Sequence, residues 1–137
     1  PMSDCIFCKI IAGEIPSMKL WEDERTLSFM DINPAAPGHC LAIPKVHASN
    51  VFELDPAALA HTAQTAQRVA RAVDAALGPD GINLIQANGK GAAQSVLHFH
   101  FHIMPRTLGD ELVLNWPVAA GNMDEIAEVA ERIRRHL

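Results

Sequence analysis

Long apolar runs, an excess of basic residues and a set of paired cysteines are all missing from this chain of 137 residues. Polar residues interrupt the longest apolar stretches within a few positions, so the sequence predicts no transmembrane helix. The formal net charge is -5, whereas a broad nucleic-acid surface needs a basic face to displace counterions. We therefore expect neither a membrane nor a nucleic acid among its partners.

Cysteine is scarce as well, and the three that are present do not suggest a disulfide framework. The first residues lack the basic and apolar regions of a signal peptide, so we expect a cytoplasmic protein. In such a protein the spacing of Cys5 and Cys8 indicates a metal pair, a redox pair or two buried thiols. With no internal repeat and no low-complexity tract, one domain spanning residues 1–137 is expected.

What is present centres on residues 98–105 (HFHFHIMP), where histidine alternates with apolar residues. Successive side chains of a strand point to opposite faces, so the histidines share one face and the apolar residues pack on the other. The histidines are His98, His100 and His102. At about 3.3 Å of rise per residue, neighbouring histidines stand roughly 6.6 Å apart, so one ligand can contact more than one of them.

This row of imidazoles has three interpretations. It is an exposed strand face that carries histidine, a zinc site with ligands at positions i and i+2, or a site where an imidazole nitrogen attacks phosphorus. The preceding residues 88–95 (NGKGAAQS) favour the third. Small residues let backbone N–H groups approach an anion, and Gln94 and Ser95 add side-chain donors. The segment is typical of a phosphate cradle, although it is neither a Walker A loop nor a dinucleotide fingerprint.

Three segments resemble the histidine triad (HIT) superfamily, in particular its bacterial Hint-like branch. They are residues 94–106 (QSVLHFHFHIMPR), 29–47 (FMDINPAAPGHCLAIPKVH) and 6–16 (IFCKIIAGEIP). The motif-bearing core covers about residues 4–106, and a C-terminal strand and helix follow in 107–137. The resemblance implies an α+β, HIT-like fold: an antiparallel sheet with one long and one C-terminal helix, the sheet continued across a homodimer.

Local patterns predict the individual elements. Asp55 and Pro56 are typical of a helix start, and Gly78 of a helix end. The apolar stripe of the last helix is expected to pack against the sheet. In chain order the predicted elements are a helix within 9–15 that ends at Gly13, strands at 20–22, 26–31, 41–43, 82–86 and 98–105, a helix over 56–77, an edge strand at 112–114 and a helix that Asn122 caps.

The resemblance implies a hydrolase that cleaves the bond at the α-phosphorus of purine nucleoside 5′-phosphoramidates or related nucleotidyl substrates. His100 would be the nucleophile that becomes nucleotidylated, beside His98, while His102 and Ser95 would hold the non-bridging oxygens. Asp31 would accept the ribose hydroxyls. The positions carried over for a purine nucleotide such as AMP are Phe7, Ile10, Phe29, Asp31, Ile32, Asn88, Gln94, Ser95, His100 and His102.

A structural zinc ion is also implied by the resemblance, whereas the chemistry itself would need no cofactor. The zinc ligands carried over are Cys5, Cys8, His47 and His98. A histidine that holds zinc has its lone pair committed to the metal, so His98 could not also relay protons.

The chain departs from the family pattern at two positions near the histidine row. Ala87 stands where the family usually has Asn or Gln, and Ala93 where it usually has Gly. Trp116 and Pro117 are similar to the C-terminal Trp-Pro of the Hint branch, but a longer tail follows here. Three alternatives remain open: a dinucleoside polyphosphate hydrolase, a nucleotide-binding module with little turnover, and a catalytic zinc site formed by the row itself.

Overall fold

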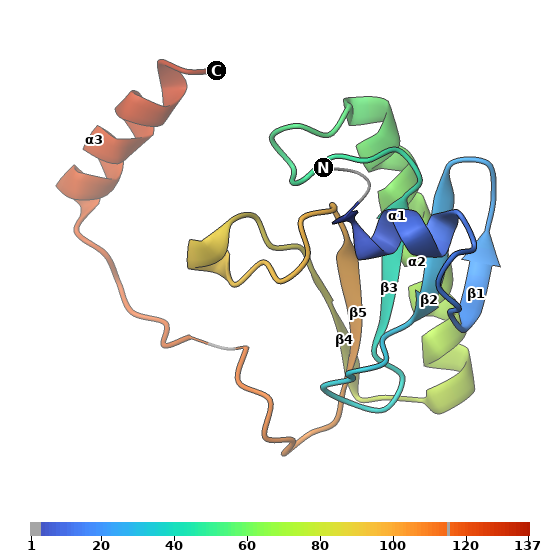
Figure 1. Ribbon diagram of the computed structural model, residues 1–137. Helices are drawn as coiled ribbons and strands as arrows, with labels where there is room; N and C mark the ends of the chain where they lie inside the picture. The colour runs from blue at the N-terminus through green and yellow to red at the C-terminus, as the bar shows by residue number, and fades with distance from the viewer. Residues whose placement is uncertain (1–3, 115) are drawn as a thin grey trace.

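A computed structural model of the chain describes residues 4–114 and 116–137. Its five strands form one antiparallel sheet in the order β1-β2-β3-β5-β4 (Figure 1). The strands are β1 (Lys19–Glu22), β2 (Thr26–Met30), β3 (Cys40–Pro44), β4 (Gly81–Ile85) and β5 (Phe101–Arg106). The helices are α1 (Ile6–Ile11), α2 (Pro56–Leu77) and α3 (Met123–Arg134), and the 3₁₀ turn η2 spans Lys90–Ala92. This arrangement confirms the expected α+β class.

The long helix α2 covers one face of the sheet, with the ends that the sequence predicts. The Asp55 carboxylate accepts hydrogen bonds from two backbone N–H groups of the first turn, and Gly78 closes the helix in the left-handed conformation (φ 56°). Its residues Ala66, Val69 and Val73 are buried against β3 and β5.

No helix in the described part of the chain combines the length and hydrophobicity that a membrane crossing requires.

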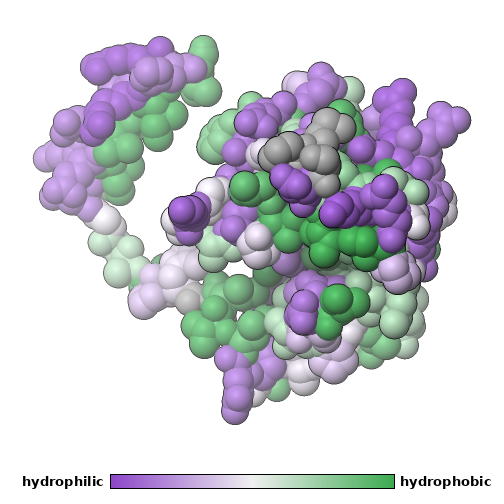
Figure 2. All heavy atoms as spheres, in the orientation of Figure 1, coloured by the Kyte–Doolittle hydropathy of each residue, from purple (hydrophilic) through white to green (hydrophobic). Residues whose placement is uncertain are grey.

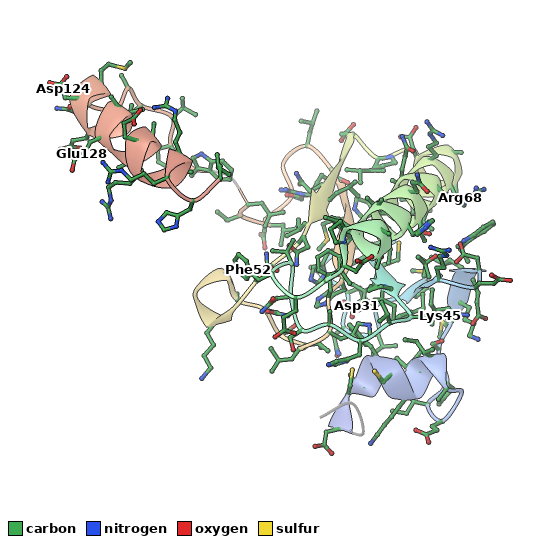
Figure 3. All side chains as sticks on the ribbon, turned by 90° about the horizontal axis from the view of Figure 1, so that it is seen from above. Asp31, Lys45, Phe52, Arg68, Asp124 and Glu128 are labelled. Carbon is green, nitrogen blue, oxygen red and sulfur yellow. The ribbon has the colours of Figure 1, made fainter. Side chains whose placement is uncertain are left out.

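The short helix α1 covers part of the opposite face, so the sheet lies between α1 and α2 (Figure 3). Phe7 and Ile10 are buried against residues of β2 and β3. The helix begins at Ile6, earlier than predicted, because the Cys5 sulfur accepts a hydrogen bond from the backbone N–H of Cys8 and caps the first turn. With helices on both faces, β2 and β3 are buried almost throughout.

The strand that carries the histidine row is shorter than predicted. It begins at Phe101, so His98 and His100 lie in the segment that leads into β5. The backbone N–H of Phe99 donates instead to the carbonyl of Ala48, 2.7 Å away. The expected alternation holds, because Phe99 packs on the side of α2 and the histidines on the side of α1. The imidazole face is not exposed, however: His98 and His100 are both buried.

Sheet register brings a further histidine to this face. Leu41 of β3 pairs with His102, and His39, two residues before Leu41, presents its ring to the same face, where its centroid lies 5.1 Å from that of His102. The loop before His39 turns at Gly38, whose φ is +90°. A Cβ at Gly38 would stand 2.5 Å from the Leu77 side chain, so the close approach requires glycine.

The C-terminal region differs from the prediction in two ways. Residues 112–114 form no strand; instead, the Arg106 guanidinium binds the carbonyl of Leu112. The helix α3 is confirmed, with the Asn122 side chain as its cap, but it stands away from the sheet (Figure 1). The predicted packing of α3 is therefore wrong. Its apolar side chains gather on one side (Figure 2) and are exposed: Ile126, Val129 and Ile133.

Candidate active site

A cavity of about 490 Å³ lies between α1 and the sheet, at the His100 and His102 end of the histidine row. Of the ten positions predicted to bind a nucleotide, eight line this cavity: Phe7, Ile10, Phe29, Asp31, Ile32, Ser95, His100 and His102. The apolar walls come from α1 and from β2 with the residues that follow it, and the polar groups gather where β5 begins. Its lining suits a ligand in which an apolar group is joined to a polar one.

The other two predicted positions, Asn88 and Gln94, do not line the cavity. The side-chain oxygen of Asn88 accepts a hydrogen bond from the backbone N–H of Val51. The Gln94 side chain accepts a hydrogen bond from the N–H of Gly89 and donates to the carbonyls of Ser49 and Val96. Both side chains thus brace the loop before β5 by pairing with backbone groups of that loop and of the segment 49–51.

The imidazole of His100 is held in one tautomer. Its Nδ1 lies 2.7 Å from the carbonyl oxygen of His98, and only an N–H can make that bond. The proton is therefore on Nδ1, and Nε2 keeps its lone pair. Burial lowers the pKa of His100 below its usual range, which favours this neutral form.

The neighbouring His102 is held in the opposite tautomer, through His39. The backbone N–H of Ala35 donates to Nδ1 of His39, at 3.1 Å, so the proton of His39 is on Nε2. That nitrogen lies 2.9 Å from Nδ1 of His102, which must accept, and His102 therefore carries its own proton on Nε2. One imidazole of the pair offers a lone pair and the other an N–H, with ring centroids 4.8 Å apart.

From the sequence, His39 is only one of several candidates for a further metal ligand and has no place in the nucleotide site, although it lies inside one of the three family-like segments. Nothing in a lone histidine before an apolar strand distinguishes it. Only the fold reveals it, by placing its Nε2 2.9 Å from Nδ1 of His102 and 3.4 Å from the Asp31 carboxylate. Burial lowers the pKa of His39, against an opposing effect of Asp31.

Charge inside the cavity is low. Its described lining contains no Lys or Arg, and Asp31 is its one carboxylate. Burial, with smaller contributions from His100 and His39, lowers the pKa of His102 to about 4, so its ring is neutral at pH 7. A phosphate in this cavity would be held by N–H and O–H donors rather than by fixed cations.

At the His98 end of the histidine row, four side chains form a second group, which we call the Cys/His cluster: Cys5, Cys8, His47 and His98. Nδ1 of His98 lies 3.4 Å from the Cys5 sulfur and 3.2 Å from Nδ1 of His47. The Cys8 sulfur lies 3.3 Å from Nδ1 of His47. These four residues are the predicted zinc ligands, and the fold brings their ligand atoms within 4.8 Å of one another.

The geometry of the Cys/His cluster fits a tetrahedral zinc ion. Zinc at about 2.3 Å from sulfur and 2.0 Å from nitrogen separates its ligand atoms by roughly 3.3 to 3.8 Å. Nε2 of His98 lies 2.8 Å from the carbonyl of Pro44, so its proton is there and Nδ1 is free for a metal. Burial lowers the pKa of His98 to about 4, which keeps the ring neutral.

The histidine row does not form a metal site by itself. Among residues 4–114 and 116–137, neither group of potential ligands contains two of the three histidines. In the second group, His39 and His102 are hydrogen-bonded to each other, with their two nitrogens 2.9 Å apart, and the Asp31 carboxylate lies 3.4 Å from Nε2 of His39. His98 thus belongs to the Cys/His cluster, whereas His100 and His102 line the cavity.

The two departures from the family pattern lie in the loop before β5. Ala93 adopts the left-handed conformation (φ 60°), in which a Cβ is unfavourable by roughly 1 kcal/mol. The fold therefore keeps the glycine-like backbone at this position in spite of the substitution. Ala87 offers no side-chain donor. The side chain of Gln86 forms two hydrogen bonds with that of Asn88 and does not line the cavity.

Comparison with known proteins agrees with this geometry. The sequence profile of the HIT domain matches residues 12–108. The adenosine 5′-monophosphoramidase hnt1 of Schizosaccharomyces pombe is 40% identical over 130 residues, with 94% of this chain and 95% of that protein covered. A crystal structure of a HIT family member from Bacillus subtilis is 39% identical and has a TM-score of 0.91, over 98% of this chain and 97% of that chain.

A Zn-bound histidine triad family protein from Mycobacterium smegmatis is similar too. Its crystal structure is 33% identical and has a TM-score of 0.77, over 96% of this chain and 99% of that chain. A family match over most of the chain, together with these relatives, establishes the class of protein that the fold and the site define. The chain belongs to the HIT family.

Burial of the neutral His102 ring predicts a pH dependence of stability. Its pKa is about 4 in the folded protein and 6.5 ordinarily, so between these values the unfolded chain binds the extra proton. The contribution is complete above pH 6.5 and is lost as the pH falls toward 4. The free energy of unfolding of the wild type is expected to fall as the pH is lowered from 7 to 5. In His102→Asn this fall is expected to be smaller by about 1 to 2 kcal/mol.

Urea unfolding at a series of pH values measures this effect. As a matched control, His136→Asn changes an exposed histidine near the C-terminus and is expected to keep the wild-type pH slope. An unchanged slope in His102→Asn would show that burial does not hold this imidazole neutral.

Proposed function

We propose that this protein hydrolyses purine nucleoside 5′-phosphoramidates through a nucleotidyl-histidine intermediate on His100. The observation that carries the proposal is the fixed tautomer of His100, which leaves its Nε2 lone pair available where the residue lines the cavity. A neutral imidazole with a free lone pair is the form that attacks an electrophile. His102, in the opposite tautomer, supplies an N–H beside it.

In the first step, Nε2 of His100 attacks the α-phosphorus, a bond between phosphorus and nitrogen forms, and the amine leaves with its electron pair and takes up a proton. In the second step, water attacks the same phosphorus, and the bond to His100 breaks to release the nucleoside monophosphate. One water is consumed: its hydroxyl ends on phosphorus, and its proton balances the one that the amine takes. The His102 N–H and the Ser95 hydroxyl hold the non-bridging oxygens while charge develops on them.

The remainder of the cavity suits a purine nucleoside. Phe7, Ile10, Phe29 and Ile32 form apolar walls for the base. The Asp31 carboxylate, at the end of β2, accepts the ribose hydroxyls, which have no other carboxylate partner in the described lining. The activity named for the relative from Schizosaccharomyces pombe, an adenosine 5′-monophosphoramidase, supports adenosine as the nucleoside.

Replacing the nucleophile tests the function directly. We expect the wild type to release AMP from an adenosine phosphoramidate such as AMP-lysine, and His100→Ala to lose about 1,000-fold or more of kcat/KM. The variant is expected to remain folded by circular dichroism and to bind AMP, because the apolar walls are intact. AMP release is measured by chromatography.

Ap4A assayed in parallel decides the leaving group, since preference for it would indicate a dinucleoside polyphosphate hydrolase. His136→Ala, at an exposed position remote from the cavity, is the control for loss of a histidine. If the wild type turns over neither substrate and still binds AMP, the protein is a nucleotide-binding module and the hydrolase proposal is wrong.

We further propose that the Cys/His cluster holds a structural zinc ion. The support is the spacing of the four ligand atoms, the free Nδ1 of His98 and the Zn-bound relative from Mycobacterium smegmatis. Bound there, zinc would join α1 to the loop after β3 and to the histidine row. Reduced thiols at Cys5 and Cys8 also agree with a cytoplasmic location, where disulfides are rare.

Metal content tests the zinc proposal. We expect about one zinc per chain in the purified wild type and none in Cys8→Ala, since three remaining ligands bind zinc far more weakly. Cys40→Ala is the matched control, because Cys40 is buried under α2 and lies outside the cluster. Plasma mass spectrometry gives the content, and equal zinc in both variants would contradict the assignment.

A homodimer is the third part of the proposal. Two surfaces of the chain support it: the outer edge of β4 pairs with no other described strand, and no residue of α3 is buried in the described chain. Open edges and exposed apolar stripes are the features that a second copy covers. Leu84 on β4, which is 49% exposed, is where the sheet would continue.

Solution mass tests the dimer. Light scattering after size exclusion is expected to give twice the 14.9 kDa of one chain. We expect Val129→Glu, on the apolar side of α3, to weaken association about tenfold, and Glu128→Gln, on the polar side labelled in Figure 3, to leave it unchanged. A monomeric wild type at micromolar concentration would contradict the proposal.

A further inference from the structure

The Cys/His cluster joins two parts of the cavity that are far apart in sequence. Two of its residues belong to the start of α1: Cys5 caps the helix, and Cys8 lies within it. A third, His98, stands two residues before the nucleophile His100. The distance between the Cys8 sulfur and Nδ1 of His98 is 3.6 Å, across 90 residues of chain.

The helix α1 has few other means of holding its place. A helix of six residues is too short to be stable by itself, so its position depends on tertiary contacts. Among residues 4–114 and 116–137, the polar contacts that join residues 4–15 to the remainder of the chain all lie between a cysteine sulfur and an imidazole nitrogen. Apolar packing supplies the rest: Phe7 and Ile10 are buried, and Ile11 and Ile15 are partly buried against the same cluster.

One of those packed side chains forms the wall of the cavity against the nucleophile. The Phe7 ring meets the His100 ring edge to face, with centroids 5.3 Å apart, and meets the Phe29 ring in the same way at 5.5 Å. A displacement of α1 would therefore open the base pocket and remove the neighbour that packs on His100.

The second connection runs through the backbone of His98. Its ring is fixed at both nitrogens, by the Cys/His cluster at Nδ1 and by the Pro44 carbonyl at Nε2. Its own carbonyl accepts the hydrogen bond from Nδ1 of His100 that selects the reactive tautomer. The orientation of the nucleophile thus depends on a residue whose side chain is a candidate metal ligand.

We propose that the Cys/His cluster is a positioning device for the nucleotide site: with zinc bound, it fastens α1 over the base pocket and fixes the His98 carbonyl that orients His100. Cys5, Cys8 and His47 then influence binding and rate without touching the substrate. The inference rests on the proposed nucleotide function of the cavity. It predicts that zinc loss weakens nucleotide affinity and also slows the transfer step, which a metal site that only stabilised the fold would not do.

His47→Ala is the test variant. Unlike His98, His47 has no backbone contact with His100, and it does not line the cavity. We expect the folded, zinc-free variant to bind AMP about tenfold more weakly by calorimetry and to lose about tenfold in kcat. Its His100 ring is expected to give averaged ¹⁵N shifts, in place of the single Nδ1–H tautomer of the zinc-loaded wild type. His47→Cys, which keeps four ligands, is expected to regain zinc together with most of the affinity and the single tautomer.

Wild type treated with a chelator, below its unfolding temperature, gives the same comparison without a substitution, so misfolding of His47→Ala does not end the test. Cys40→Ala, which removes a buried thiol outside the cluster, is expected to match the untreated wild type. Unchanged AMP affinity and an unchanged His100 tautomer after zinc loss, in folded protein, would overturn the inference.

Failure of the proposed function gives a different pattern. If zinc-loaded wild type binds AMP without turnover, the hydrolase proposal fails, but AMP affinity and the His100 ring shifts still report on positioning. If it binds no AMP, the ring shifts with and without zinc decide the inference by themselves. A shift in tautomer on zinc removal supports it in either case.

Discussion

The hydrogen bond from Nδ1 of His100 to the carbonyl of His98 is the constraint on which the site depends. It exists because β5 begins only at Phe101, so the carbonyl of His98 is not used in the sheet and is free to accept a side-chain donor. Had the strand extended over the whole row, that carbonyl would face a neighbouring strand. The shortened strand thus converts a row of equivalent imidazoles into residues with different chemistry.

Each histidine of the row is set in its tautomer by a backbone group. The carbonyl of Pro44 holds His98, the carbonyl of His98 holds His100, and the N–H of Ala35 acts on His102 through His39. Burial keeps the rings neutral, which makes hydrogen-bond direction rather than charge the property that distinguishes them. The ring proton is on Nε2 of His98, on Nδ1 of His100 and on Nε2 of His102, so the tautomer alternates where the sequence shows only the repetition of one residue.

The two helices that flank the sheet contribute in different ways. α2 is long, well capped and packed along the sheet, so it stabilises the scaffold whether or not a ligand is present. α1 has only six residues and stands over the cavity, and its contacts with the remainder of the chain are apolar packing and the Cys/His cluster. The helix that stabilises the scaffold, α2, and the cavity under α1 therefore lie on opposite faces of the same strands.

The sequence by itself determined the α+β class, the ends of α2 and the identity of the histidine row, because capping residues, apolar periodicity and a rare alternating motif are all local signals. It also placed eight of the cavity residues, through segments that resemble a known family. Only the tertiary structure decided where β5 begins, that α3 leaves the sheet, that Gln94 braces a loop, and that His39 fixes His102. Those outcomes depend on strand register and on competition for hydrogen-bond partners, which join residues distant in the chain.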